Sequence, residues 1–260
     1  MQRRKFFQSS MATATAIALG IDSTNATGQA PPQKEIYEWR EYDMKWGSDQ
    51  SQLETFFKTA LIPAYNKYGI KTIGVFKERS QSEPTKIFLL IPYSSIEDFV
   101  SVTAKVKADA EFVKNSEAYN AIKAEKPVFT RYTTTIMNAF DGWPKLTVAK
   151  GESRIFELRT YEGYSEDALR RKLKMFNEGE FPIFVRTGLN PVFFGEVIAG
   201  DKMPRLTYMI TFNSMEDHDK AWAAFGADPD WKKLLADSQY ANTVSNIIKT
   251  FLVPTAYSQV

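Results

Sequence analysis

The stretch Ile36-Tyr37-Glu38-Trp39-Arg40-Glu41-Tyr42 returns later in the chain as Ile155-Phe156-Glu157-Leu158-Arg159-Thr160-Tyr161. The offset between the two is 119 residues, and it holds without a gap far beyond this phrase. A register kept for so long indicates an internal repeat, in which each copy is one structural unit. Further residues are related by the same offset: Pro63 to Pro182, Gly69 to Gly188, and Ser95-Ile96-Glu97-Asp98 to Ser214-Met215-Glu216-Asp217.

Each copy shows the apolar periodicity of strand, helix, strand, strand, helix, strand. We predict strands at 36–42, 71–78, 86–93 and 129–136, and again at 155–161, 191–197, 205–212 and 248–253. The first helices are predicted at about 50–68, with a kink at Pro63, and at about 166–187. The second helices follow Ser95 and Ser214, the predicted caps, and break near Asp109 and Asp228.

This βαββαβ order is that of the ferredoxin-like unit, an α+β fold with helices on one face of an antiparallel sheet. The bare face of each sheet needs a cover, so we expect the two repeats to close into one pseudo-two-fold barrel. We place the repeats at 35–140 and 153–256, with a linker at 141–152 that is rich in Gly and Pro. Pairing of whole chains into a homodimer stays open at this stage.

The first thirty residues have the composition of an export signal rather than of a folded element. Arg3 and Arg4 form a twin-arginine start, and a short apolar run follows them. We expect residues 1–30 to be a signal peptide and leader, cleaved near Ala26, with Ala30 as the alternative. The run is too short to span a bilayer, so no stable membrane insertion is expected. An extracytoplasmic location, periplasmic or secreted, follows from this interpretation.

Charge and residue composition exclude several classes of function. Without residues 1–26 the chain keeps thirty basic and thirty acidic residues, with no basic stripe, so we expect no nucleic-acid partner. The chain has one histidine, His218, and no cysteine, which disfavours zinc, copper and iron–sulfur sites. Phosphate-binding glycine loops are absent from the sequence. We therefore predict no cofactor and no metal.

Strand alternation supplies the candidate ligand-binding residues, because successive side chains point to opposite faces of a sheet. We assign the apolar set of the repeated phrase, such as Trp39 and Leu158, to the helix side. The polar set is then expected to face the barrel interior; it comprises Glu38, Arg40, Tyr42, Glu157, Arg159 and Tyr161. Each Glu can simply neutralise the Arg two residues away. Alternatively, Arg binds an anionic ligand group, Tyr donates a hydrogen bond, and Glu orients Arg or acts as a base.

His218 lies in a helix expected on the outside of the barrel. We expect it to face solvent. A half-buried helix position is the alternative, because Phe99 stands at the equivalent place in the first copy, and haem ligation is a third.

The aligned phrases resemble the NIPSNAP family. The second copy carries Phe156-Glu157-Leu158-Arg159-Thr160-Tyr161 and Ala224-Phe225-Gly226-Ala227-Asp228-Pro229-Asp230-Trp231, which look like the two signature stretches of that family. The first copy is a degenerate version, with Ala110 in place of Pro and Phe112 in place of Trp. The resemblance implies the dimeric α/β-barrel superfamily, which includes cofactor-free monooxygenases and haem enzymes, and it implies no settled reaction.

Three functions are compatible with these observations. The leading hypothesis is an exported barrel that binds a small organic molecule in its interior. One alternative is a cofactor-independent, monooxygenase-like enzyme that acts on an aromatic or quinone-like substrate, and this rests on the resemblance. The other alternative is a protein-interaction module whose barrel is filled with side chains. The sequence leaves open whether the protein is catalytic.

Overall fold

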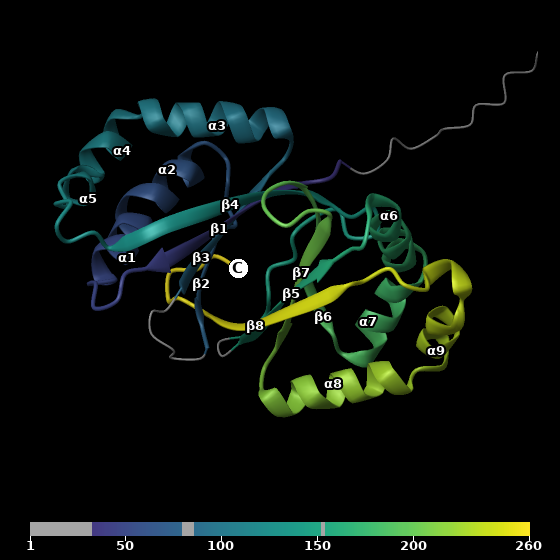
Figure 1. Ribbon diagram of the computed structural model, residues 1–260. Helices are drawn as coiled ribbons and strands as arrows, with labels where there is room; N and C mark the ends of the chain where they lie inside the picture. Colours follow the sequence, from purple (N-terminus) through teal and green to yellow (C-terminus); the bar gives the residue numbers. More distant parts are fainter. Residues whose placement is uncertain (1–32, 80–85, 152–153) are drawn as a thin grey trace, which may run out of the picture. The chain divides into compact units, whose positions relative to one another are not determined.

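The computed structural model describes residues 33–79, 86–151 and 154–260, whose strands form a closed barrel (Figure 1). The strand order around the barrel is β1-β3-β2-β8-β5-β7-β6-β4. The strands are β1 (Ile36–Met44), β2 (Gly74–Glu78), β3 (Lys86–Tyr93), β4 (Phe129–Ala139), β5 (Ile155–Glu162), β6 (Asn190–Ala199), β7 (Arg205–Phe212) and β8 (Asn246–Pro254). The predicted signal segment 1–30, with Ala26, lies outside the described residues.

The barrel is made of two four-stranded halves with the same order, β4-β1-β3-β2 and β8-β5-β7-β6. Strands β2 and β8 pair at one junction, with Phe76 opposite Pro254, and β4 and β6 pair at the other, with Met137 opposite Val197. All the pairings are antiparallel. The predicted α+β class and the barrel of two ferredoxin-like repeats are thus confirmed.

The first helix of each repeat contains one turn of π-helix. In the first repeat α1 (Ser51–Phe56), the π segment (Phe57–Leu61) and α2 (Ile62–Lys67) are continuous. In the second repeat the corresponding parts are α6 (Glu166–Met175), the π segment (Phe176–Glu180) and α7 (Phe181–Thr187). The irregularity predicted at Pro63 is therefore a π turn just before the proline, which accommodates a residue that lacks a backbone donor.

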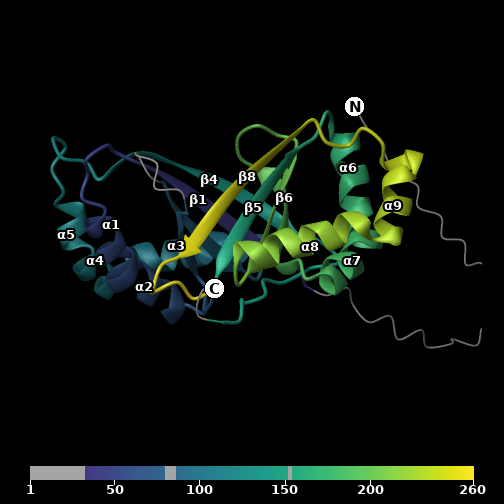
Figure 2. The ribbon, with the colours of Figure 1, turned by 90° about the horizontal axis from the view of Figure 1, so that it is seen from below.

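The second helical stretch of each repeat is divided where the sequence predicted a break. It forms α3 (Ile96–Ala108), α4 (Ala110–Asn115) and α5 (Glu117–Asn120) in the first repeat, and α8 (Met215–Ala227) and α9 (Pro229–Ala236) in the second. The Ser95 and Ser214 hydroxyls accept from the amides of Asp98 and Asp217, as predicted for N-caps. Figures 1 and 2 show the strands lying between α1–α5 on one side and α6–α9 on the other.

The barrel interior takes in apolar residues of the repeated phrase, which corrects the predicted facing. Trp39 and Leu158 belong to one buried cluster inside the barrel, together with aromatic residues from the other strands. The polar set faces the helices instead. The prediction was wrong because both faces of each strand are buried, so alternation separates the two faces without showing which one is inward. The interior cluster comprises Tyr37, Trp39, Phe76, Phe88, Leu90, Met137, Ala139, Phe156, Leu158, Val192, Phe193, Val197, Met209, Leu252 and Val260.

One end of the barrel is closed by two segments that are not strands. Leu146 and Ala149, in the connection between the repeats, pack against the interior cluster. The C-terminal residues are the second segment. The Gln259 amide donates to the Ile73 carbonyl at 2.9 Å, and Val260, which is 1% exposed, belongs to the interior cluster. Among the residues that the structure describes, no helix is both long and apolar enough to cross a membrane.

Candidate functional site

A cavity of about 450 Å³ lies between the sheet and the helices of the second repeat. Its walls are mainly aromatic and aliphatic, and a few charged and hydroxyl groups converge on it, which is the usual make-up of a small-molecule site. We call it the helix–sheet pocket. It is lined by Arg159, Tyr161, Lys172, Met175, Glu180, Phe184, Trp222, Phe225, Trp231, Leu235, Tyr240, Ala241, Asn242, Thr243, Val244 and Ile247.

Arg159 is the central cation of the helix–sheet pocket. Strand β5 directs it toward the helices, where its Nη1 donates to Glu157 Oε1 at 2.7 Å. Its Nε and Nη2 lie 3.3 and 3.1 Å from the Tyr161 hydroxyl. The guanidinium also stacks 4.3 Å from the centre of the Trp222 ring, in a cation–π contact. These contacts hold the guanidinium in one orientation at the pocket wall.

Glu157 is the acceptor that organises this wall. It is 1% exposed, and its second oxygen, Oε2, accepts from Trp222 Nε1 at 2.8 Å and lies 3.3 Å from His218 Nε2. The pairing of Glu157 with Arg159 is therefore present, and α8 adds the Trp222 donor and the nearby His218 ring. Both oxygens of this buried carboxylate therefore have polar partners, as a buried polar group requires.

His218 does not face solvent, contrary to the prediction. Its side chain is 14% exposed and lies against the rings of Phe212 and Phe251. The half-buried alternative therefore describes its position. Its Nδ1 lies 2.7 Å from Asp219 Oδ1, so the ring spans an exposed carboxylate and the buried Glu157.

The hydroxyls of Tyr161 and Tyr208 extend the hydrogen-bond network of Arg159. The Tyr161 and Tyr208 hydroxyls are 2.9 Å apart. Burial raises the pKa of Tyr208 well above its ordinary value, and the nearby Tyr161 raises it further, which keeps Tyr208 a neutral donor. This hydroxyl pair joins the Arg159 wall to the aromatic cluster around Phe194, whose ring stacks on Tyr208 at 4.9 Å.

Lys172 and Glu180 form a buried ion pair in the same pocket, on α6 and the π segment that follows it. Their side chains are 7% and 3% exposed. Burial raises the pKa of Glu180, while Lys172 and Arg159 oppose that change. The Lys172 ammonium also lies 4.7 Å from the centre of the Phe176 ring. The π turn matters here, because it brings Glu180 inward within reach of Lys172.

The first repeat has the same strand motif but lacks this polar pocket. Glu38 Oε1 accepts from Arg40 Nε at 2.5 Å, and Glu38 Oε2 accepts from the Tyr93 hydroxyl at 2.8 Å. Tyr42 packs against Phe57 and Phe129 rather than pairing with a hydroxyl. Glu38, Arg40 and Tyr42 therefore lie between sheet and helices, as their second-repeat counterparts do, but in an apolar setting.

Differences between the repeats reveal the residues that strand alternation missed. At the repeat offset, Lys172 corresponds to Leu53, Glu180 to Leu61, and Trp222 to Thr103. Met175 corresponds to Phe56, whose ring stacks on Tyr119 at 4.1 Å and lies 6.0 Å from Phe112. The first repeat therefore has a stacked ring at the position where the second repeat has the pocket residue Met175. A search of the aligned repeats for positions where a charged residue replaces a leucine would have identified Lys172 and Glu180 from the sequence.

No carboxylate or histidine cluster of metal-ligand type accompanies the pocket. Within the described ranges, no group of three or more His, Cys, Asp or Glu side chains is placed to hold a metal ion. The groups that converge on the pocket are suited instead to an organic molecule. Arg159 and Lys172 can donate to an acceptor oxygen, and Glu180 can accept a proton or a hydrogen bond.

Comparison with known proteins agrees with this architecture. The NIPSNAP family model matches residues 156–259, so the resemblance is confirmed over the second repeat. A protein of Lactobacillus acidophilus NCFM, provisionally described as a monooxygenase, matches with 13% identity and a TM-score of 0.56, covering 87% of this chain and 97% of its own. A protein of Fusobacterium nucleatum with the same provisional description matches with 9% identity and a TM-score of 0.54, covering 86% and 93%.

A NIPSNAP family protein of unknown function from Agrobacterium tumefaciens covers 41% of this chain and 92% of its own, with 19% identity and a TM-score of 0.37. No curated protein shows significant sequence similarity to this chain.

Proposed function

We propose that this chain, a barrel whose second repeat carries the NIPSNAP match, binds a small, planar, partly apolar organic molecule in the helix–sheet pocket. The observation that carries the proposal is the buried Lys172–Glu180 pair, which lies beside Arg159 in a cavity whose other walls are mainly aromatic and aliphatic. The first repeat places Leu53 and Leu61 at these positions, so the fold does not need the charges. A buried ion pair is seldom more stabilising than a hydrophobic pair, which favours a role in binding.

Charge balance in the pocket indicates the class of ligand. Arg159 is paired with Glu157, which does not itself line the pocket, and Lys172 is paired with Glu180, so these four charges balance one another. A polyanion would therefore bind without net attraction, whereas a phenol, a quinone or a weak organic acid needs only one polar contact. Trp222 and Trp231 contribute aromatic surfaces to the walls, while Arg159 donates from the sheet side and Lys172 from the helix side. The ligand belongs between helices and sheet, and not in the barrel interior.

Native mass spectrometry of the protein purified from its own host tests this proposal without a guessed ligand. We expect extra mass that is lost on denaturation, and isothermal titration with the released compound should then give its affinity. Met175→Phe is the blocking variant, because Phe56 fills the equivalent place in the first repeat. We expect it to fold and to lose binding by about a hundredfold.

Phe56→Met is the matched control, since it makes the reverse change in the first repeat and should leave ligand affinity unchanged. Bare protein from several preparations, or full binding by Met175→Phe, would contradict the proposal.

A second candidate is cofactor-independent oxidation of an aromatic or quinone-like substrate, and the raised pKa of Glu180 favours it. A buried carboxylate with a raised pKa can take the proton of a phenol. Oxygen uptake with a panel of naphthols and hydroquinones is the direct test. We expect activity to fall at least about tenfold in Glu180→Gln. Flat oxygen traces across the panel would leave binding as the function.

We further propose that the mature domain works outside the cytoplasm. Support comes from the Arg3-Arg4 start and from the absence of cysteine in the sequence. The test is fractionation of host cells that express the full chain, with Arg3→Lys/Arg4→Lys as the variant. Export lost in the variant supports the proposal, and unprocessed protein that stays in the cytoplasm in both forms overturns it.

A further inference from the structure

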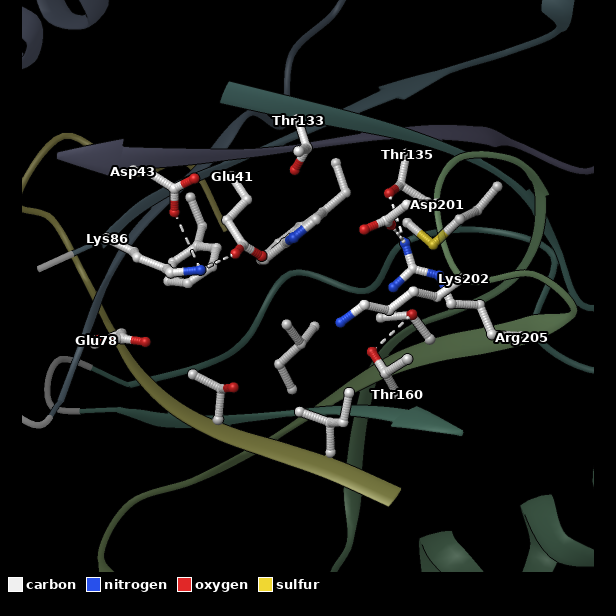
Figure 3. Close-up of a pocket in the computed structure, with 17 residues that line it drawn as sticks. Glu41, Asp43, Glu78, Lys86, Thr133, Thr135, Thr160, Asp201, Lys202 and Arg205 are labelled. Carbon is white, nitrogen blue, oxygen red and sulfur yellow. Dashed lines mark hydrogen bonds and ion pairs between the residues drawn. The ribbon is translucent and has the colours of Figure 1, made fainter. Parts of the chain in front are cut away.

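The open end of the barrel holds a second cavity, of about 400 Å³, that is separate from the helix–sheet pocket (Figure 3). Its floor is apolar, formed by Trp39, Phe88, Met137 and Leu158 at the edge of the interior cluster. Charged and hydroxyl side chains surround its opening. They are Glu41, Asp43, Glu78, Lys86, Thr133, Thr135, Thr160, Asp201, Lys202, Arg205, Thr207 and Thr250.

The charges of this cavity are divided between its two sides. The first repeat contributes three carboxylates against one lysine, Lys86, which pairs with Glu41 and lies 3.2 Å from Asp43. The second repeat contributes Lys202 and Arg205 against a single carboxylate, Asp201. One wall therefore carries an excess of negative charge and the opposite wall an excess of positive charge.

Each wall has a charged group that is incompletely matched within the described residues. Glu78 makes no hydrogen bond or ion pair there, and burial raises its pKa, with Glu41 adding to the rise and Lys86 opposing it. Opposite, Arg205 Nη2 bonds Thr135 Oγ1 at 3.0 Å and Asp201 Oδ1 at 2.7 Å, but its buried Nε has no partner.

Lys202 is the second unmatched cation, and its side chain extends into the space between the walls (Figure 3). It makes no ion pair in the described part of the chain. Its φ of +48° is unusual for a residue with a side chain, so the β6–β7 loop holds this lysine at some conformational cost.

The polarity arises from differences between the repeats. Lys86 and Arg205 are equivalent at the repeat offset, so both halves supply a cation. Glu41 and Glu78, however, correspond to Thr160 and Val197, which removes two carboxylates from the second half. Closure of the barrel alone does not require the two sides of this cavity to carry different charges.

We infer that this second cavity, which we call the barrel mouth, is a binding site for a small zwitterion. The ammonium group of the ligand lies at the Glu78 wall and its carboxylate at the Lys202 and Arg205 wall. The Trp39–Phe88 floor contacts the apolar part of the ligand between its two charged groups, and threonine side chains line the space around it. An organic ammonium fits better than a metal ion, because no three carboxylates of the described chain converge as metal ligands. The site shares no lining residue with the helix–sheet pocket.

Isothermal titration with aminocaproate and its shorter and longer homologues tests the inference. Hexylamine and hexanoate are the single-charge controls. We expect one chain length to bind at least about tenfold more tightly than either control. Equal affinities for zwitterions and controls at every length would overturn the inference.

Two charge variants locate the ends of the ligand. Glu78→Gln should weaken aminocaproate by about fivefold and leave hexanoate unchanged, and Lys202→Gln should weaken hexanoate and leave hexylamine unchanged. Glu78→Lys should reverse the preference, so that adipate binds more tightly than aminocaproate. Glu162→Gln is the matched control, because Glu162 is equivalent to Asp43 but does not line the cavity.

Circular dichroism melting of each variant confirms that it folds. Binding that survives all the mouth variants but is lost in Met175→Phe assigns the zwitterion to the helix–sheet pocket, and this also overturns the inference.

Discussion

The same three residue types, Glu, Arg and Tyr, recur on one strand of each repeat. Their surroundings differ, and the second set lies beside a cavity that could hold a ligand. Glu38 and Arg40 are enclosed by apolar helices, whereas Glu157 and Arg159 border a cavity with a second ion pair. The sequence offered neutralisation of each Arg by its Glu as one of two interpretations, and the structure contains both ion pairs. A comparison of the repeats identifies Lys172 and Glu180 as charges that replace leucines. It does not place them at that wall, because they come from a helix whose π turn decides which side chains point inward.

Replacement of Lys172 and Glu180 provides a test of what the buried pair does for stability. Lys172→Leu alone leaves a buried carboxylate without its partner and should lower the free energy of unfolding by about 3 kcal/mol. The double variant Lys172→Leu/Glu180→Leu copies the first repeat and should be as stable as the parent, to within about 1 kcal/mol, or more stable. Urea unfolding measures both values. A double variant less stable than either single variant would show that the pair is structural.

At the scale of elements, the periodicity of the chain predicted every strand of the barrel and the divided second helices. It could not predict the inward face of β1 and β5, because helices cover one side and the opposite half-barrel covers the other. Solvent normally identifies the outer face of a sheet, and here neither face meets solvent. The predicted interior residues Arg159 and Tyr161 nevertheless line a pocket, on the side of the sheet opposite to the one expected.

Asp228 connects two helices of the second repeat and makes their packing dependent on pH. It caps α9 through the amides of Asp230 and Trp231, and it accepts from Arg186 of α7 at 2.6 and 2.8 Å. Arg186 is the main cause that lowers the pKa of Asp228 from 3.8 to about 2. The folded carboxyl thus binds protons more weakly than the unfolded one. Its contribution to stability is complete above about pH 4 and is lost as the pH falls toward 2.

The measurement is the melting temperature of the parent and of Asp228→Asn, which keeps a capping side chain but not the charge. We expect the difference between them to shrink as the pH falls through this range. In Arg186→Gln, a carboxyl titration followed by NMR should show the pKa of Asp228 moving back toward 3.8. A difference in melting temperature that does not change with pH would rule out the ion pair as its source.

At the scale of the molecule, the two repeats depend on each other for closure. Strands β2 and β6 each pair with the last strand of the other repeat, and the interior cluster takes side chains from both. The repeat offset and the need to cover two bare sheet faces were enough to predict this barrel. The closure of one end by Leu146, Ala149 and Val260 was not predictable, because those segments carry no periodicity of their own.

A fragment that spans residues 154–260 tests this mutual dependence. Alone, it would expose the inner face of its sheet, including Phe156, Phe193 and Met209, and would leave β6 and β8 as unpaired edges. We expect it to form a dimer that rebuilds the barrel from two copies, or to unfold. Size-exclusion chromatography with light scattering distinguishes these states, and a stable folded monomer would contradict the expectation.

The covalent connection at 141–151 also has an evolutionary consequence. In a barrel assembled from two identical chains, every substitution enters both halves at once. A charged residue introduced between the sheet and the helices of one half is therefore present in the other half as well. Joining the halves in one polypeptide lifts that restriction. One half can then acquire Lys172 and Glu180 while the other retains Leu53 and Leu61. A covalent connection thus allows the two halves to diverge in their buried charges while they still share one scaffold.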